Sequence, residues 1–212
     1  ERAGAHAVAV LGGPAHAAEM LDRGASVVIA SLDPGFASRL SDMFTQAKLD
    51  VATTTDVTGV ELAGCAKNAA VLAAGAASVA GPNVAGAAAG KVFAEIDALA
   101  RARGSRPETF AGLAGAGDLV ATVVASGSRN RRAGELLAQG VPAAEIPNAI
   151  GQAAEAVDSV PLLASAAHQA AIDSPALDGL TALLDGRIEP HQWAATITEP
   201  PRRKRRGSVR AA

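Results

Sequence analysis

The sequence is poor in cysteine and in aromatic residues. Among 212 residues it has one Cys, one Trp, four Phe and no Tyr. A single cysteine excludes an intramolecular disulfide framework and a cysteine-based zinc site, and it suits a reducing cytoplasm. So few rings leave little with which to stack nucleic-acid bases. In their place the sequence has 53 Ala and 22 Gly, a composition typical of closely packed, Ala-rich helices.

Complete metal and nucleotide motifs are also absent from the sequence. The four histidines show no ligand spacing and predict no metal site; they are His6, His16, His168 and His191. Gly86–Lys91 has three residues between its glycines, whereas a phosphate loop needs four. Gly112–Gly117 (GLAGAG) follows a helical segment, not the strand that a dinucleotide fingerprint requires.

Charge is unevenly distributed along the chain. The net charge is −2, but residues 201–212 hold six cations and no acid, which leaves the rest of the chain at −8. A net negative charge over residues 1–200 repels nucleic acid, and only the basic tail at 201–212 would attract it. Residues 71–90 are uncharged, but Gly81-Pro82 interrupts them, which favours a pair of helices over a membrane span. Glu1–Leu11 does not resemble a signal peptide. We therefore expect a soluble, cytoplasmic protein with no membrane span.

Hydrophobic periodicity divides the chain into two structured regions. Ala7–Leu11, Ser26–Ala30 and Leu49–Thr54 read as strands that alternate with two helices, at 15–23 and 33–44, a pattern that predicts parallel pairing. From Asp56 the period is helical, with Gly115–Asp118 read as a turn and 119–124 left open between strand and helix. The other helices are expected at 56–80, 83–103, 107–113, 128–139, 142–150, 154–171, 175–184 and 190–197. The predicted fold class is therefore α/β followed by all-α.

Two polar clusters carry candidate chemistry. Lys67 lies in an otherwise uncharged helical stretch, where it either faces inward as a proton donor and acceptor or reaches out to solvent. Asp118 lies at a glycine-rich turn, and Ser128, Arg129 and Asn130 begin a helix whose free N–H groups favour an anion. The alternative for the second cluster is a capped helix start with a solvated basic face.

Four segments in register resemble one enzyme family. They are TGVELAGCAKN (58–68), GLAGAGDLVAT (112–122), SRNRRAGELLAQG (128–140) and GQAAEAV (151–157). In this order and spacing they resemble bacterial-type NAD(P)-dependent glycerol-3-phosphate dehydrogenase. The resemblance implies a C-terminal remnant of a Rossmann domain at 1–55, an all-helical substrate and catalytic domain at 56–199, and a basic tail at 200–212. It also implies reduction of dihydroxyacetone phosphate to sn-glycerol 3-phosphate with NAD(P)H for phospholipid synthesis, and it allows a homodimer.

The resemblance also assigns roles to individual residues. Lys67 resembles the catalytic lysine that exchanges a proton with the substrate oxygen, and Asp118 resembles the carboxylate beside it. The positions that resemble substrate contacts are Gly13, Lys67, Asn68, Asp118, Thr122, Ser128, Arg129 and Asn130. The positions that resemble contacts of the NAD or NADP cofactor are Ala17, Arg129, Ala153 and Glu155.

The chain also departs from this family's pattern. Ala15 stands where the family commonly has a polar residue, and the family's glycine-rich strand-to-helix turn and a second lysine precede the point where this sequence starts. Because the sequence opens at Glu1, we expect a truncated fragment that is catalytically silent alone. The alternatives are another β-hydroxyacid-type dehydrogenase, a non-catalytic helical interaction module, and a nucleic-acid binder that uses the tail.

Overall fold

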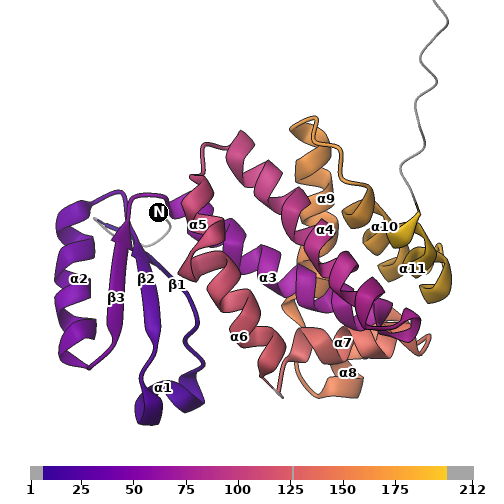
Figure 1. Cartoon of the computed structure of the whole chain (residues 1–212), viewed down its shortest axis with the longest axis horizontal. Coiled ribbons are helices and arrows are strands. Elements are labelled where there is room, and N and C mark those ends of the chain that lie inside the picture. Colours follow the sequence, from indigo (N-terminus) through magenta and orange to yellow (C-terminus); the bar gives the residue numbers. More distant parts are fainter. Residues whose placement is uncertain (1–6, 126, 200–212) are drawn as a thin grey trace, which may run out of the picture.

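The computed structural model describes residues 7–125 and 127–199. Figure 1 shows a small sheet with one covering helix on one side and a larger helical region on the other. The sheet region consists of β1 (Val10–Gly12), α1 (Ala17–Arg23), β2 (Ser26–Ala30), α2 (Pro34–Gln46) and β3 (Asp50–Thr54). The basic tail predicted at 200–212 lies outside the described residues.

The sheet has the order β1-β2-β3, with the buried strand β2 at its centre. β2 and β3 are parallel, in register from Ser26 opposite Asp50 to Ala30 opposite Thr54. β1 is antiparallel to β2, so the prediction of three parallel strands is wrong for β1. α2 packs along β2 and β3 and returns the chain to the starting edge, as a parallel crossover requires. The seven-residue α1 instead lies beyond the ends of β1 and β2, so the chain reverses there (Figure 1).

The helical region begins directly after β3. Its elements are α3 (Val57–Ala77), η1 (Ser78–Ala80), α4 (Pro82–Ala102), α5 (Pro107–Ala111), η2 (Leu113–Gly117), α6 (Asp118–Val124), α7 (Arg129–Ala138), η3 (Ala143–Glu145), α8 (Ile146–Ile150), α9 (Glu155–Gln169), α10 (Pro175–Leu184) and α11 (Pro190–Thr198). The predicted turn before Asp118 is a π-helical turn, η2, and the ambiguous segment after it is the helix α6. A Cβ at Gly115 would lie 2.2 Å from the Phe110 carbonyl oxygen, so only glycine allows this wide turn to pack on α5. The predicted helix at 142–150 divides into η3 and α8.

α3 is the central helix of this region. It packs against α4, α7 and α9, and with η1 it is long and apolar enough to cross a membrane by length and composition alone. More than half of its apolar stretch is buried inside the protein, as expected of a core helix. Small residues bring the helices close together: a Cβ at Gly134 of α7 would lie 2.2 Å from the carbonyl oxygen of Leu72.

Asp56 joins the sheet region to the helical region. Its carboxylate caps α3 by accepting the Gly59 N–H at 2.9 Å. It also accepts the backbone N–H of Arg106 at 2.9 Å and the hydroxyls of Ser105 and Thr109 at 3.0 and 2.6 Å. Burial raises the pKa of Asp56, but these hydrogen bonds together outweigh burial and hold the pKa below its ordinary value.

The guanidinium of Arg106 strengthens the same junction. It donates to the hydroxyls of Thr54 and Thr55 at 3.1 and 2.8 Å, immediately after β3. The end of β3, the start of α3 and the α4–α5 connection are thereby held together, which sets the position of the sheet beside α3.

Candidate functional site

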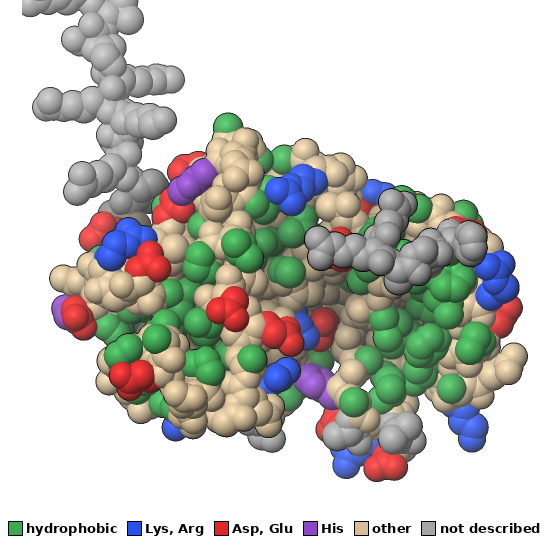
Figure 2. Space-filling view, turned by 180° about the vertical axis from the view of Figure 1, so that it is seen from behind, with side chains coloured by type: hydrophobic (Ala, Val, Ile, Leu, Met, Phe, Trp, Pro, Cys, Tyr) green, Lys and Arg blue, Asp and Glu red, His purple; other side chains and the backbone are tan. Residues whose placement is uncertain are grey.

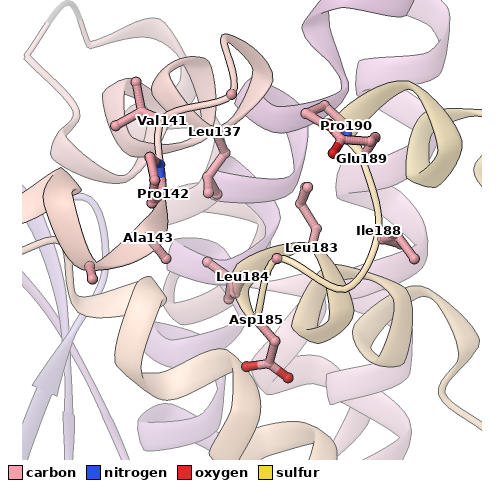
Figure 3. A pocket seen from close by; sticks show the side chains of 13 residues that line it. Leu137, Val141, Pro142, Ala143, Leu183, Leu184, Asp185, Ile188, Glu189 and Pro190 are labelled. Atoms are coloured by element: carbon pink, nitrogen blue, oxygen red, sulfur yellow. The ribbon is translucent and has the colours of Figure 1, made fainter.

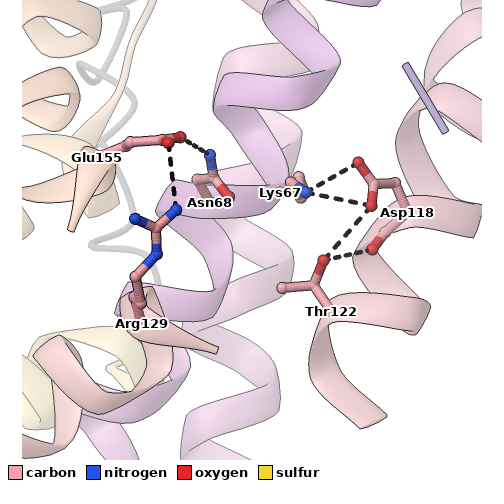
Figure 4. Close-up of polar contacts among 6 residues, drawn as sticks. All are labelled: Lys67, Asn68, Asp118, Thr122, Arg129 and Glu155. Atoms are coloured by element: carbon pink, nitrogen blue, oxygen red, sulfur yellow. Dashed lines mark hydrogen bonds and ion pairs between the residues drawn. The ribbon is translucent and has the colours of Figure 1, made fainter. Parts of the chain in front are cut away.

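Lys67 and Asp118 form an ion pair between α3 and α6. The Lys67 Nζ lies 3.0 Å from Oδ2 and 3.2 Å from Oδ1 of Asp118 (Figure 4). Their side chains are 19% and 10% exposed, so both charges are largely withdrawn from water while a ligand can still reach them. The interpretation in which Lys67 reaches into bulk solvent is wrong, because Asp118 draws it inward.

Thr122 supports the carboxylate of this pair. It lies one turn after Asp118 on α6, and its hydroxyl donates to the Asp118 carbonyl oxygen at 2.8 Å and reaches Oδ1 at 3.5 Å (Figure 4). Thr122 is buried, and its described contacts are with Asp118. In this structure the hydroxyl that was predicted to contact substrate therefore helps to orient Asp118.

Glu155 connects a second polar group across three helices. Its Oε2 accepts a hydrogen bond from Asn68 Nδ2 at 3.0 Å, and its Oε1 lies 3.6 Å from Nη2 of Arg129 (Figure 4). Asn68 was predicted to contact substrate, but here its amide binds Glu155. A helix turns by about 100° per residue, so adjacent residues on α3 face different neighbours. Because Lys67 and Asn68 are adjacent in a predicted helix, the sequence alone could have indicated that their side chains contact different groups.

The start of α7 is partly occupied by its own hydrogen bonds. The Ser128 hydroxyl oxygen caps the helix by accepting the Arg131 N–H at 3.3 Å. Asn130 is buried, and its Oδ1 accepts the Ala156 N–H at 3.1 Å. Ala154, the residue that precedes α9, offers no capping side chain, so Asn130 supplies the acceptor that this helix start needs. Among the described contacts, Asn130 thus binds the start of α9 and neither Lys67 nor Asp118.

The remaining predicted positions lie around these groups. Gly13 follows β1 with φ +105°, a conformation that favours glycine, and a Cβ there would lie 2.9 Å from the Ser26 carbonyl oxygen. The next residue, Pro14, lies against Gly117, immediately before Asp118. Ala17 begins α1 and Ala153 precedes α9, and both are exposed.

Several hollows surround the described residues. Figure 2 shows one between the sheet region and the helical region, with acidic and basic side chains next to each other inside it. A hollow of about 420 Å³ at the start of α7 is lined by the arginines at 129, 131 and 132, together with Ser128 and Glu135. Figure 3 shows another, of about 330 Å³, between the connections α7–α8 and α10–α11; its lining is mainly aliphatic and includes none of the predicted site residues.

The sequence predicts no metal site, and the structure can be searched for one only over the described residues. Within residues 7–125 and 127–199, no group of three or more His, Cys, Asp or Glu side chains is arranged to hold a metal ion. The polar groups described above are suited to binding an anion and to moving a proton.

Comparison with protein families matches most of the helical region. Residues 56–195 match the family model described as "NAD-dependent glycerol-3-phosphate dehydrogenase C-terminus". Similar curated proteins include a glycerol-3-phosphate dehydrogenase (NAD(P)+) of Aromatoleum aromaticum, 37% identical over 200 residues. Another, with the same name, from Methylibium petroleiphilum is 39% identical over 196 residues. The matches cover 92% and 91% of this chain but only 61% and 59% of these relatives, so the chain spans about three fifths of their length.

Solved structures agree with this comparison. Glycerol-3-phosphate dehydrogenase from Coxiella burnetii superposes with a TM-score of 0.83 at 32% identity, covering 92% of this chain and 61% of that one. The corresponding Plasmodium falciparum protein has a TM-score of 0.79 at 16% identity, covering 90% of this chain and 56% of that one, and supports the fold alone. The predicted fold class, a partial α/β region followed by a helical region, is confirmed.

Proposed function

The chain belongs to the glycerol-3-phosphate dehydrogenase family, and on that premise we propose that it carries the substrate-binding and proton-transfer part of such an enzyme. The reaction is the interconversion of dihydroxyacetone phosphate and sn-glycerol 3-phosphate with NAD or NADP. The observation that carries the proposal is the ion pair of Lys67 and Asp118, withdrawn from water between α3 and α6. The proposal places the reaction in the cytoplasm, where its product feeds phospholipid synthesis.

Lys67 serves as the proton donor and acceptor. In the reductive direction its ammonium donates a proton to the carbonyl oxygen of the substrate while hydride reaches the adjacent carbon. In the oxidative direction the neutral amine takes the proton from the hydroxyl as hydride leaves. Asp118, 3.0 Å from Nζ, holds the ammonium in place, and Thr122 holds Asp118.

The start of α7 supplies the phosphate site. Arg129 is 46% exposed, and its described pairing with Glu155 is a long one at 3.6 Å, so its guanidinium can exchange that partner for a phosphate. The first N–H groups of a helix also favour an anion. Arg131 and Arg132 line the adjacent hollow and add positive potential there.

The residues at the start of α9 fit a nicotinamide dinucleotide. Glu155 is 64% exposed, so its carboxylate is available to accept hydrogen bonds from ribose hydroxyls or from a carboxamide. Ala17 and Ala153, both exposed, and the Gly13 turn leave the nearby backbone accessible. When bound, this cofactor supplies or accepts the hydride. The protein's own groups bind the substrate, hold the proton and orient the reacting carbon.

A binding experiment tests this proposal. We expect isothermal titration of the full chain to show saturable binding of sn-glycerol 3-phosphate and much weaker binding of glycerol. Lys67→Met should lower the affinity for sn-glycerol 3-phosphate by about 10–150-fold. This is the effect of losing a charge-assisted hydrogen bond of roughly 1.5–3 kcal/mol. Lys48→Met, a change of an exposed lysine on the α2–β3 connection, is the matched control. Equal binding of glycerol and its phosphate, or a Lys67→Met variant that binds like the wild type, would contradict the proposal.

A further inference from the structure

Gly64 leaves open space beside the Lys67–Asp118 pair. A Cβ built at this position would have no atom within 4 Å apart from its two chain neighbours and the backbone of its own helix. Lys67 and Asn68 follow three and four residues later, so each of them is a neighbour of Gly64 on the surface of α3. No side-chain atom of Lys67 or Asn68 lies within 4 Å of this Cβ position, so the space beside Gly64 is not filled by either of them.

Packing does not explain the glycine at this position. α3 has three glycines, and the other two are confined: a Cβ would lie 2.1 Å from Asp56 Oδ2 at Gly59 and 2.6 Å from the Arg131 carbonyl oxygen at Gly75. Gly64 has ordinary right-handed helical backbone and no such neighbour. Glycine in a helix interior makes the helix less stable than alanine does. At position 64 no packing contact requires that loss of stability.

We propose that Gly64 is a specificity-determining residue that keeps room for the part of the substrate beyond its reacting carbon. This inference rests on the proposed function. Along α3, Asn68 marks the end near Glu155 and Arg129, Lys67 marks the reacting oxygen, and Gly64 lies one turn further toward the sheet. At about 1.5 Å per residue, Gly64 is roughly 4.5 Å from Lys67 along the helix axis, so it lies on the side of Lys67 opposite to Asn68.

The geometry therefore favours a short phosphorylated alcohol or ketone as ligand. Its phosphate binds at Arg129, its oxygen contacts Lys67, and its terminal hydroxymethyl group lies against Gly64. A side chain at position 64 would occupy the same space, which is open in the structure. The glycine thus determines the size of the substituent that fits beyond the reacting carbon.

Two substitutions at Gly64, each with a matched control, test this inference. Gly64→Ala and Gly64→Leu are compared with Gly90→Ala and Gly90→Leu on α4, where a Cβ also meets nothing within 4 Å and the position is exposed. Thermal unfolding and isothermal titration are measured on the full chain with sn-glycerol 3-phosphate and with inorganic phosphate. We expect all four variants to unfold at or above the wild-type temperature. Affinity for sn-glycerol 3-phosphate should fall a few-fold in Gly64→Ala and more than about tenfold in Gly64→Leu, and stay within about twofold in both Gly90 variants.

Titration with inorganic phosphate distinguishes binding at the Arg129 end of the proposed site from binding at the Gly64 end. The phosphate ion occupies only the Arg129 end, so it should bind the wild type and Gly64→Leu equally. If Gly64→Leu binds sn-glycerol 3-phosphate like the wild type, or if Gly64→Ala fails to fold, the role of Gly64 is overturned while the proposed function stands. If the folded wild type binds no sn-glycerol 3-phosphate, the proposed function fails, and this inference fails with it.

Discussion

At the scale of single residues, the candidate site consists of charged side chains that pair with one another. Lys67 is held by Asp118, and Arg129 shares Glu155 with Asn68. The two pairs differ in exposure: the first is largely buried, whereas both members of the second are open to solvent. A buried pair resists exchange of partners, while an exposed pair exchanges readily with a ligand anion. In the proposed function, this difference gives the orienting role to Lys67 and Asp118 and the anion-binding role to Arg129.

Arg129→Ala tests the anion role. We expect affinity for sn-glycerol 3-phosphate to fall by about 1.5–3 kcal/mol, or roughly 10–150-fold, with little change in the unfolding temperature. Calorimetric titration at low salt measures the first and thermal unfolding the second. Arg103→Ala, at an exposed position after α4, should bind like the wild type. Unchanged affinity in Arg129→Ala would remove Arg129 from the phosphate site.

Cys65 should react slowly with thiol reagents. Burial raises its pKa, and the carboxylates of Glu61 and Glu155 raise it further, so little thiolate is present near neutral pH. We expect alkylation by iodoacetamide at pH 8 to be several-fold slower in the folded chain than in the chain unfolded with urea. Mass spectrometry over time follows the modification. Equal rates in the two states would show that Cys65 is not shielded.

At the scale of helices and strands, local signals in the sequence were sufficient for some elements and not for others. The helix at Arg129–Ala138 follows a serine cap and was predicted within a residue or two, because capping is a local interaction. The direction of β1 was not predicted, since it depends on where α1 lies relative to the sheet. The π-helical turn before Asp118 was also missed, because it depends on Gly115 packing against Phe110 of α5.

The contact between α3 and α7 depends on two glycines that face each other. A Cβ at Gly134 would lie 2.2 Å from the Leu72 carbonyl oxygen and 2.8 Å from the Gly75 Cα, so the helices would have to separate. We expect Gly134→Ala to lower the free energy of unfolding by about 1–3 kcal/mol or more. Gly86→Ala, on α4 with nothing within 4 Å, should raise it by up to about 1 kcal/mol. Urea unfolding measures both, and a neutral Gly134→Ala would contradict the close contact.

At the scale of the whole molecule, the position of the sheet region beside α3 depends on the buried carboxylate of Asp56. The sequence predicted that a helix begins at Asp56, but the contacts of its carboxylate with Ser105, Arg106 and Thr109 join residues about fifty positions apart. Such distant contacts leave no periodic signal. For the same reason the residue pattern alone left Lys67 and Asp118 in two separate clusters. The family resemblance implied that they lie side by side, and in the structure they form an ion pair.

Asp56 should make the stability of the chain sensitive to acid. Its pKa is lowered in the folded state, so the folded protein favours the carboxylate more than the unfolded chain does. The stability it contributes is present above the unfolded pKa, near about 4, and is lost as the pH falls through the folded value. We expect Asp56→Asn to be less stable at pH 7 and to lose less stability below pH ~4 than the wild type.

Urea unfolding at a series of pH values measures this dependence. Asp42→Asn, an exposed change on α2, is the control and should follow the wild-type curve. Parallel curves for Asp56→Asn and the wild type below pH ~4 would show that the Asp56 carboxylate does not hold the two regions together.

The most direct test of the central claim is a map of where sn-glycerol 3-phosphate binds. At 21.0 kDa the chain is suited to amide ¹H–¹⁵N NMR, in which a bound ligand shifts the signals of nearby residues. Titration should shift amides around Lys67, Asp118 and Ser128–Asn130 in one saturable process, while glycerol leaves them in place. Shifts confined to the aliphatic hollow of Figure 3, or no shifts at millimolar ligand, would contradict a substrate site between α3, α6 and α7.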